Sequence, residues 1–356
     1  MHSLPTIKAQ RNQVSSPGEP PRPHCLPKTA QITLTEELDF VRKKRSYTKR
    51  LAEKTLQEVL EKNIHSVAKA GIVTTEEIER MLKDASEGLS DFKPSQLKRL
   101  GIDEIALVKG KGNYCAVLVD IDSKKLLAIL EKRTQEELRK FLLGWGVEVL
   151  EQIEEVSIDL WLAYKNLGID LMPNAQVVAD RFHVMTQINK ELDQERKREK
   201  QQRKKSLEKA SSDQAKTKHQ KVLEILTKSK YALLKNEKDL NKEQKKQLSE
   251  VKKISVNLKK MHELKEKIRK IFEKTSNWYT GLVKLGIWLS RAKKYFPESQ
   301  KTINRWLDEI IAYFDHRTTS GVVEGINNKL KLIKRSAYGF RNFENFRFEM
   351  FIKLAF

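Results

Sequence analysis

Apolar residues follow a helical period in the first third of the chain. Between residues 34 and 90 they recur at every third or fourth position, in LAEKTLQEVLEKNIHSVAKA and in TTEEIERMLKDA. Gly71 separates these stretches, and Thr74 with Glu77 matches the Thr-x-x-Glu capping box that begins a helix. Helix, short turn and helix is the arrangement of a helix-turn-helix, so we expect residues 34–95 to form a DNA-binding region of that kind. A plain helical hairpin has the same pattern, and the second helix is too acidic to suit phosphates.

The pattern changes to short apolar runs between residues 100 and 180. Three predicted strands, IDEIALVKG, NYCAVLVDI and KKLLAILEK, are separated by turn-forming segments and followed by a helical stretch, TQEELRKFLLGWGVEVLEQ. Two more strands are predicted in EEVSIDLW and AQVVADRFHV, with a short helix, AYKNLGIDL, between them. This order indicates an α/β domain built on a mixed five-stranded sheet.

A long helical block follows the fifth predicted strand. Residues 174–280 contain no Pro and residues 169–280 contain no Gly, while Leu, Ile and Val recur with helical spacing. Long helices are predicted here, with a coiled-coil hairpin as one arrangement. We therefore expect a helical insertion over residues 184–310 that interrupts one α/β domain, formed by residues 96–183 and 311–356.

Charge narrows the choice of partner. The chain has 356 residues and a formal net charge of +22, and residues 191–280 hold 27 Lys and Arg against 14 Asp and Glu. Such a field favours polyanions, nucleic acid above all, although a merely soluble basic protein has the same composition. Because glutamates are interleaved with the lysines, single positions in this block fit a solvated helix face.

Other features exclude several classes of protein. No apolar run reaches the length of a membrane span, and Cys25 and Cys115 alone exclude a disulfide scaffold and an all-cysteine zinc site. Six of the nine prolines lie at or before Pro27, so residues 1–33 are expected to form a disordered arm. This arm lacks the apolar segment of a secretory signal, which favours a soluble, cytoplasmic protein.

Acidic residues on apolar strands are the first candidates for chemistry, because an unpaired buried carboxylate is costly. Asp103 opens the first predicted strand and Asp159 ends the fourth, so they would meet if those strands are neighbours. Glu324 could join them from a helix packed on the sheet. Three carboxylates at one point repel each other unless a divalent cation neutralises them, and oxygen ligands suit Mg2+ or Mn2+. Taken singly, each acid equally fits a turn, a cap or a salt bridge.

Two further motifs carry polar chemistry. Asp180 and His183 end the fifth predicted strand at a spacing of three, which fits a hydrogen-bonded pair and is too few ligands for zinc. After Glu324, amides and cations alternate in a run that suits phosphate contact, or equally a solvated helix face. The run contains Asn327, and its DNA-binding candidates are Asn328, Lys329, Lys331, Lys334, Arg335 and Arg341.

Three segments together resemble a known family. They are GIDEIALVKGKGNYCAVLVDIDSKKLLAILEKRTQEEL, IDLWLAYKNLGIDLMPNAQVVADRFHVMTQINKELDQER and SGVVEGINNKLKLIKRSAYGFRNFENFRFEMF. They closely resemble the ISL3 family of bacterial insertion-sequence transposases, over residues 50–356. The resemblance implies a ribonuclease H-like fold and a transposase that cleaves DNA and transfers strands at the ends of its element. It also implies double-stranded DNA as partner, two Mg2+ or Mn2+ ions, and a homo-oligomer on DNA.

The resemblance also assigns roles to residues. It places the catalytic, metal-binding triad on Asp103, Asp159 and Glu324, with Asp180 and His183 in support; in a competing register Asp180 is the second aspartate. Family members carry a cysteine-rich zinc segment, whereas only His24 and Cys25 stand near the start of this chain. Two alternatives therefore stay open: a DNA-binding transposase remnant, impaired in catalysis or recognition, and another ribonuclease H-like nuclease.

Overall fold

The computed structural model describes residues 39–90, 93–106, 114–317, 321–336 and 343–355. The predicted arm and Arg341 lie outside these residues. The chain forms two compact units that divide after Glu58. In the described part of the first unit, Val41 and Thr48 form an antiparallel bridge, and helix α1 (Lys49–Glu61) begins after it. The expectation of helix from residue 34 is therefore wrong over residues 39–48, because this segment closes on itself through the bridge.

The second unit opens with two helices, α2 (Ile64–Ala70) and α3 (Thr75–Ser90). The predicted capping box is confirmed: the Thr74 amide donates to Glu77 Oε2 at 3.0 Å, and the Glu77 amide donates to Thr74 Oγ1 at 3.2 Å. Helix α3 packs against α16 (Phe343–Ala355), so this helical region shares a surface with the carboxyl-terminal helix. DNA reading by these helices stays a prediction.

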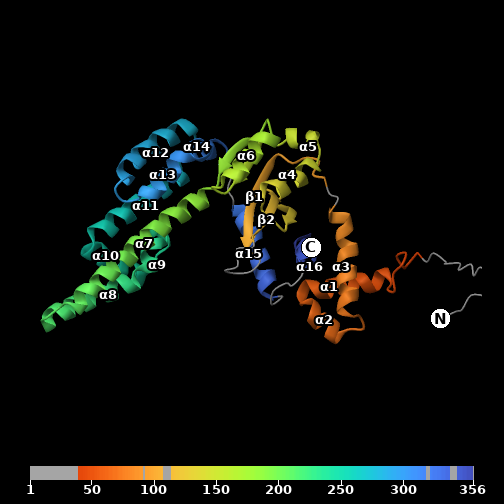
Figure 1. Cartoon of the computed structure of the whole chain (residues 1–356), viewed down its shortest axis with the longest axis horizontal. Coiled ribbons are helices and arrows are strands. Elements are labelled where there is room, and N and C mark those ends of the chain that lie inside the picture. Colours follow the sequence, from red (N-terminus) through yellow and green to blue (C-terminus); the bar gives the residue numbers. More distant parts are fainter. Residues whose placement is uncertain (1–38, 91–92, 107–113, 318–320, 337–342, 356) are drawn as a thin grey trace, which may run out of the picture. The chain divides into compact units, whose positions relative to one another are not determined.

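The centre of the second unit is a five-stranded mixed sheet (Figure 1). Its strands are β1 (Arg99–Ala106), β2 (Tyr114–Asp120), β3 (Lys125–Leu130), β4 (Glu155–Ile158) and β5 (Gln176–Ala179). Their order is β3-β2-β1-β4-β5; β2 is antiparallel to β1 and β3, whereas β4 is parallel to β1 and β5. The predicted sheet is thus confirmed, as is the adjacency of the first and fourth strands.

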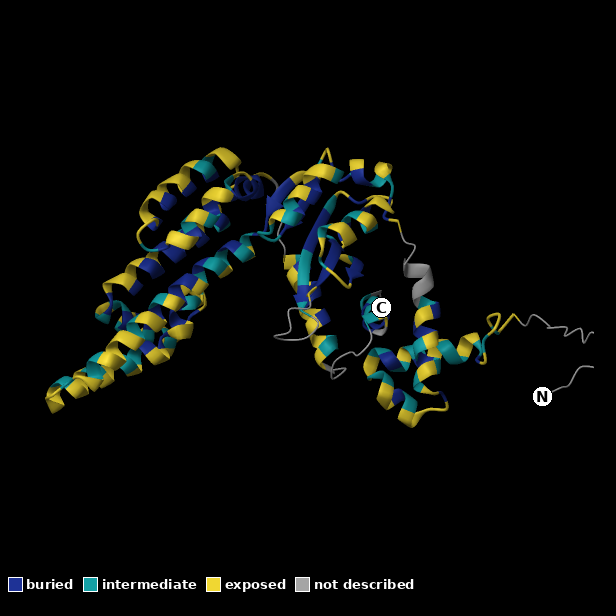
Figure 2. Ribbon diagram, viewed as in Figure 1, coloured by how far each residue is buried: buried dark blue, intermediate teal, exposed yellow. Residues whose placement is uncertain are grey.

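Helices cover both faces of the sheet, which explains why its strands read as nearly continuous apolar runs (Figure 2). On one face, strand residues such as Ile102 and Val156 pack with α4 (Gln135–Leu143), α5 (Val147–Glu151) and α6 (Leu162–Leu171). On the other face, strand residues such as Ile105 and Val117 pack with α15 (Gly321–Ser336) and α16. The side chain of Asp103 shares this second face with Ile105, because side chains alternate along a strand.

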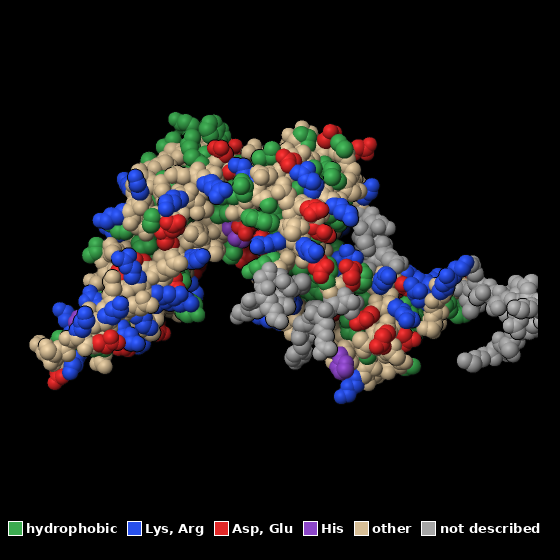
Figure 3. Space-filling model, viewed as in Figure 1, with side chains coloured by type: hydrophobic (Ala, Val, Ile, Leu, Met, Phe, Trp, Pro, Cys, Tyr) green, Lys and Arg blue, Asp and Glu red, His purple; other side chains and the backbone are tan. Residues whose placement is uncertain are grey.

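The predicted helical insertion is present between β5 and α15. It comprises α7 (Arg181–Glu208), α8 (Asp213–Lys228), α9 (Lys230–Leu234), the 3-10 helix η1 (Glu237–Asp239), α10 (Lys242–Ile254), α11 (Val256–Lys274), α12 (Trp278–Ala292), α13 (Pro297–Arg305) and α14 (Leu307–His316). Helices α7 and α8 pack against each other, and α14 packs on the edge strand β5. In the view of Figure 3, Lys and Arg side chains are spread over this block with acidic side chains between them. Within the described ranges, no helix is long and apolar enough to cross a membrane.

Gly101 lets α15 approach β1 closely. A Cβ at this position would lie 2.6 Å from Cγ2 of Val323, and 3.3 Å from Cγ1 of Ile121. Val323 is buried on α15 next to Glu324. A side chain at position 101 would therefore push away the helix that carries the third predicted acid.

We expect Gly101→Ala to lower the free energy of unfolding by about 1–3 kcal/mol, the usual cost of overpacking a core. Gly325→Ala on the same helix is the matched control, since a Cβ there meets no atom within 4 Å. This control should be neutral or should stabilise by up to about 1 kcal/mol, because Ala favours a helix over Gly. Urea denaturation of both variants measures the difference, and equal stability of the two would contradict the close-packing argument.

Candidate active site

Three carboxylates and one imidazole meet at the carboxyl ends of β4 and β5, level with the middle of β1. Asp103 lies within β1, Asp159 directly follows β4, and Asp180 and His183 begin α7 after β5. These strands are parallel, so their carboxyl ends share one edge of the sheet, where open α/β sheets bind ligands. Asp103 does not open its strand as expected, because β1 starts four residues earlier at Arg99. The pairing of Ile102 with Ile158 places Asp103 and Asp159 side by side.

The side chains are close enough to share a ligand. One oxygen of Asp103, one oxygen of Asp159 and one ring nitrogen of His183 all lie within 4.8 Å of one another. His183 Nδ1 lies 3.5 Å from Asp159 Oδ1, and His183 Nε2 lies 3.9 Å from Asp103 Oδ1. These three side chains keep 20–26% of their surface exposed, so a ligand from solvent can reach them.

Asp180 has a local structural task. It is the N-cap of α7 and accepts from the Phe182 amide at 2.8 Å, while its other oxygen lies 3.0 Å from His183 Nδ1. The predicted Asp–His hydrogen bond is therefore confirmed. Their assignment to the end of a strand is wrong: β5 stops at Ala179, and Asp180 begins the helix because a short acidic side chain satisfies free amides at a helix start.

The charges of the carboxylates and of the His183 imidazole shift one another's pKa values. Burial raises the pKa of Asp103 to about 6, and the charges of Asp159 and Asp180 add to this, against the hydrogen bond from the Glu104 amide and the charge of His183. Burial disfavours the imidazolium of His183, but the hydrogen bond to Asp180 and the charge of Asp159 outweigh it and raise the pKa of His183 to about 9. A positive ring thus balances the carboxylates.

Asn327 is a site residue that the sequence placed in a different role. Its Nδ2 donates to Asp103 Oδ2 at 2.6 Å, and the residue is only 2% exposed. Its Oδ1 is buried and has no hydrogen-bond partner in the part of the chain that the structure describes. The sequence grouped Asn327 with a surface run of amides and cations, although its spacing of three from Glu324 marks the same side of a helix.

Glu324 lies in the first turn of α15 and is exposed. The group of ligand atoms within 4.8 Å does not include it. It stands one helical turn before Asn327, whose side chain reaches Asp103. The structure thus brings together Asp103 and Asp159, with Asp180 and His183 beside them, and places Glu324 on the adjoining helix.

The predicted DNA-binding cations divide into two kinds. Lys334 is partly buried and donates to the Ala106 carbonyl at the end of β1, and burial lowers its pKa. Asn328, Lys329, Lys331 and Arg335 are exposed on α15. Lys334 therefore joins α15 to the sheet, whereas the exposed members face solvent.

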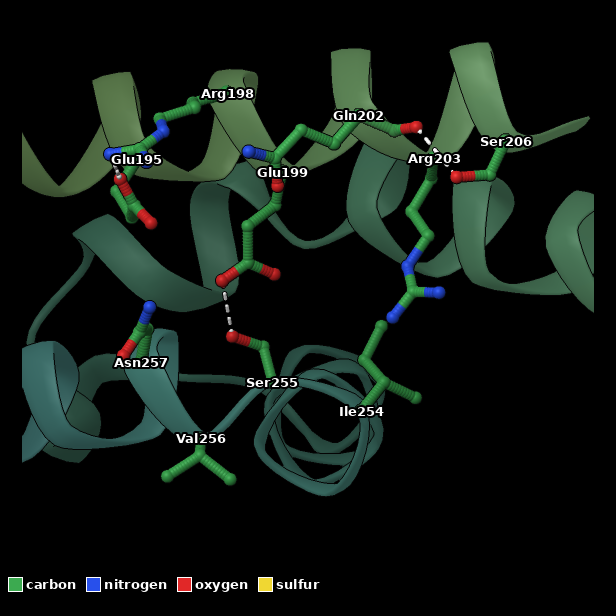
Figure 4. Close-up of a pocket in the computed structure, with 10 residues that line it drawn as sticks. All are labelled: Glu195, Arg198, Glu199, Gln202, Arg203, Ser206, Ile254, Ser255, Val256 and Asn257. Atoms are coloured by element: carbon green, nitrogen blue, oxygen red, sulfur yellow. Dashed lines mark hydrogen bonds and ion pairs between the residues drawn. The ribbon is translucent and has the colours of Figure 1, made fainter.

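A cavity of about 490 Å³ opens in the helical insertion, along α7 and the start of α11 (Figure 4). Its lining begins at Glu195, about three helical turns beyond His183. Ser255 Oγ donates to Glu199 across it at 2.6 Å, and burial raises the pKa of Glu199. Acidic and basic side chains line it together, so it is a feature of helix packing, separate from the acidic centre.

The sheet order, the adjacent aspartates of β1 and of the residue after β4, and the helix α15 packed on β1 are typical of a ribonuclease H-like fold. A family model described as "Transposase", the ISL3 group of DDE transposases, matches residues 100–350. The chain therefore belongs to the ISL3 family of insertion-sequence transposases, and the predicted family, fold class and enzyme class are confirmed.

Individual relatives agree with the family model. The chain is 27% identical over 330 residues to the transposase for insertion sequence element IS1001 of Bordetella parapertussis. This alignment covers 87% of this chain and 74% of that protein. It is 30% identical over 279 residues to the transposase for insertion sequence element IS1557 of Mycobacterium tuberculosis. This second alignment covers 74% of this chain and 61% of that protein. Family membership implies dependence on a divalent metal and DNA as substrate.

We expect Asn327→Ala to weaken Mn2+ binding by about 10–100-fold, the usual effect of losing a group that orients a metal ligand. The physical reason is that Asp103 loses the donor that fixes its Oδ2. Titration calorimetry of the full chain with Mn2+, without DNA, measures the affinity. Asn328→Ala, the exposed neighbour, is the control and should bind Mn2+ as the wild type does; equal loss in both variants would contradict a positioning role for Asn327.

Proposed function

We propose that this chain cleaves DNA at the ends of an insertion sequence and joins those ends to target DNA. The observation that carries the proposal is the juxtaposition of Asp103, within β1, and Asp159, directly after the parallel neighbouring strand β4, inside the segment matched by the transposase family. The proposed metal ligands are Asp103, Asp159 and Glu324, and the proposed cofactor is a pair of Mg2+ or Mn2+ ions.

The donor set fits such a metal. Two half-buried carboxylates provide hard oxygen ligands, and the orphaned buried Oδ1 of Asn327 is a further oxygen next to Asp103. When bound, divalent cations would activate a water or a 3′ hydroxyl as nucleophile and stabilise the leaving 3′ oxygen. The proposal needs Glu324 to approach from α15, where it stands one turn from the Asn327–Asp103 contact.

The protein's own groups hold this centre in place. The Glu104 amide donates to Asp103 Oδ1 at 2.7 Å while Asn327 donates to Oδ2, so both oxygens of Asp103 are fixed. Both oxygens of Asp180 already serve the Phe182 amide and His183. The group of ligand atoms within 4.8 Å contains Asp159 and not Asp180, and the Asp180 side chain is only 7% exposed. This favours Asp159 over Asp180 as the second metal ligand, with Asp180 and His183 in support.

The remaining parts of the proposal concern how DNA is held. The basic helices of the insertion and the exposed Lys329 and Lys331 would position a duplex through its phosphates. The helices of residues 34–95 would contribute to recognition of the element's ends. Double-stranded DNA as substrate, a homo-oligomer on that DNA, and action on DNA in the bacterial cytoplasm also belong to the proposal.

We expect Asp103→Ala, Asp159→Ala and Glu324→Ala each to abolish nicking of a duplex that carries the element's end, in Mg2+. Removing a metal-binding carboxylate prevents charge stabilisation at the phosphate but leaves the basic surfaces intact, so binding should stay within about threefold of the wild type. Gel-based cleavage and mobility-shift assays measure the two effects. Glu148→Ala, an exposed acid on α5, is the control and should cut normally.

Three results would change the assignment. An active Asp159→Ala beside an inactive Asp180→Ala would move the second ligand to Asp180. A wild-type chain that binds the element's end but never nicks it would indicate a DNA-binding remnant. Release of free ends without joining to target DNA would indicate another type of ribonuclease H-like nuclease.

A further inference from the structure

Arg133 is held at the same edge of the sheet as the acidic centre, in the loop between β3 and α4. Its guanidinium carbon lies 4.7 Å from the centre of the Tyr114 ring and 5.0 Å from the centre of the Trp161 ring. Its Nη1 donates to Glu104, whose carboxylate is mostly buried. Two aromatic rings and a carboxylate, contributed by three separate segments, therefore fix the position of this cation.

The restraint leaves part of the guanidinium free. The Arg133 side chain keeps 40% of its surface exposed. Within the described ranges only Nη1 takes part in a hydrogen bond, so the N–H groups of Nε and Nη2 remain available. A guanidinium has five donors in a rigid fork that matches the oxygens of a phosphate. Arg133 is thus a pre-organised donor group with an open edge.

The surroundings of Arg133 connect it to the acids. Glu104 follows Asp103 on β1, so its side chain points to the opposite face of the sheet, and Trp161 comes two residues after Asp159. The Tyr164 ring packs edge-to-face on Trp161 at 4.6 Å, with its hydroxyl buried and without a hydrogen-bond partner in the described structure. Burial raises the pKa of Tyr164, and the charges of Glu104, Asp103 and Asp159 raise it further while the charge of Arg133 opposes them.

The contacts around Arg133 are more extensive than an ion pair that only supports the fold would need. Exposed ion pairs contribute little to stability. Arg139 forms such a pair with Asp170, between α4 and α6, and its side chain is about as exposed as that of Arg133. Arg133 differs because its carboxylate partner, Glu104, and one of its ring contacts, Trp161, lie on the segments that carry Asp103 and Asp159.

We propose that Arg133 binds a phosphate of the DNA strand that flanks the scissile bond. The ligand class is a phosphodiester, and this inference rests on the proposed DNA cleavage at Asp103 and Asp159. Glu104 offsets part of the charge of Arg133, so the site attracts DNA less than a free arginine but places the strand in a fixed register.

The test compares binding at several salt concentrations. The full chain and its variants are titrated against a duplex oligonucleotide carrying the element's end, without divalent cations, across a series of KCl concentrations. Arg133→Gln should weaken binding by about tenfold and reduce the slope of log Kd against log salt by about one, as expected for one lost phosphate contact. Arg139→Gln, the matched exposed arginine, should change neither quantity.

Two more variants separate DNA contact from folding. Glu104→Gln frees Arg133 from its carboxylate and should tighten binding by about twofold to fivefold, since the charge facing DNA increases. Arg133→Lys keeps the charge and should keep the salt slope of the wild type. If Arg133 only supports the fold, Glu104→Gln will weaken binding as Arg133→Gln does, and that result would overturn the proposal.

The outcomes also distinguish this inference from the proposed function. Normal nicking by Asp103→Ala would refute the acidic centre, and with it the place of Arg133 beside a scissile bond. Loss of nicking in Asp103→Ala, combined with a salt slope in Arg133→Gln equal to that of Arg139→Gln, would refute the Arg133 contact alone.

Discussion

Repulsion among carboxylates at one edge of the sheet is the constraint on which the rest of this structure depends. Two unit charges 4 Å apart near a protein surface interact by about 4 kcal/mol, so Asp103, Asp159 and Asp180 cannot share the edge without compensation. In the structure the compensation comes from the His183 imidazolium and from donors fixed in the fold, the Glu104 amide and Asn327. Each donor is set by a different element, so the centre exists only when β1, α7 and α15 are all in place.

The same centre depends on the close contact of α15 with β1. Gly101 admits Val323, Lys334 bonds to the Ala106 carbonyl, and Asn327 bonds to Asp103. None of these contacts involves Glu324, which leaves that side chain exposed on a helix that is already anchored. Because α15 is anchored, the backbone position of Glu324 is fixed, which lowers the conformational cost of any contact that this side chain makes with the centre.

The sequence predicted the sheet and one half of the centre because those depend on local pattern and on a topological rule. A three-strand meander followed by a helical crossover allows the first and fourth strands to be neighbours, and the structure has this pairing, which brings Asp103 to Asp159. Asp180 was harder to place, since an aspartate fits both the end of a strand and the N-cap of a helix. Asn327 and Arg133 were beyond reach because their roles depend on contacts across 224 and 29 residues of sequence, with Asp103 and Glu104 respectively. A polar residue in a run of cations gives no sign of burial until the helix is packed.

The distribution of charge explains why one restrained arginine matters in a chain with a net charge of +22. More than half of that excess lies in residues 191–280, on helices whose lysines and arginines are mostly exposed and whose side chains are long and flexible. Such cations attract a duplex from any direction, and their contact energy falls with salt, but they do not fix which phosphate reaches Asp103 and Asp159. Register requires a donor whose own position is determined by packing. The rings of Tyr114 and Trp161 give Arg133 that property, while the nearby negative charge of Glu104 limits non-specific attraction. Capture of DNA and its alignment are therefore physically separable tasks, and our proposals give them to different parts of the chain.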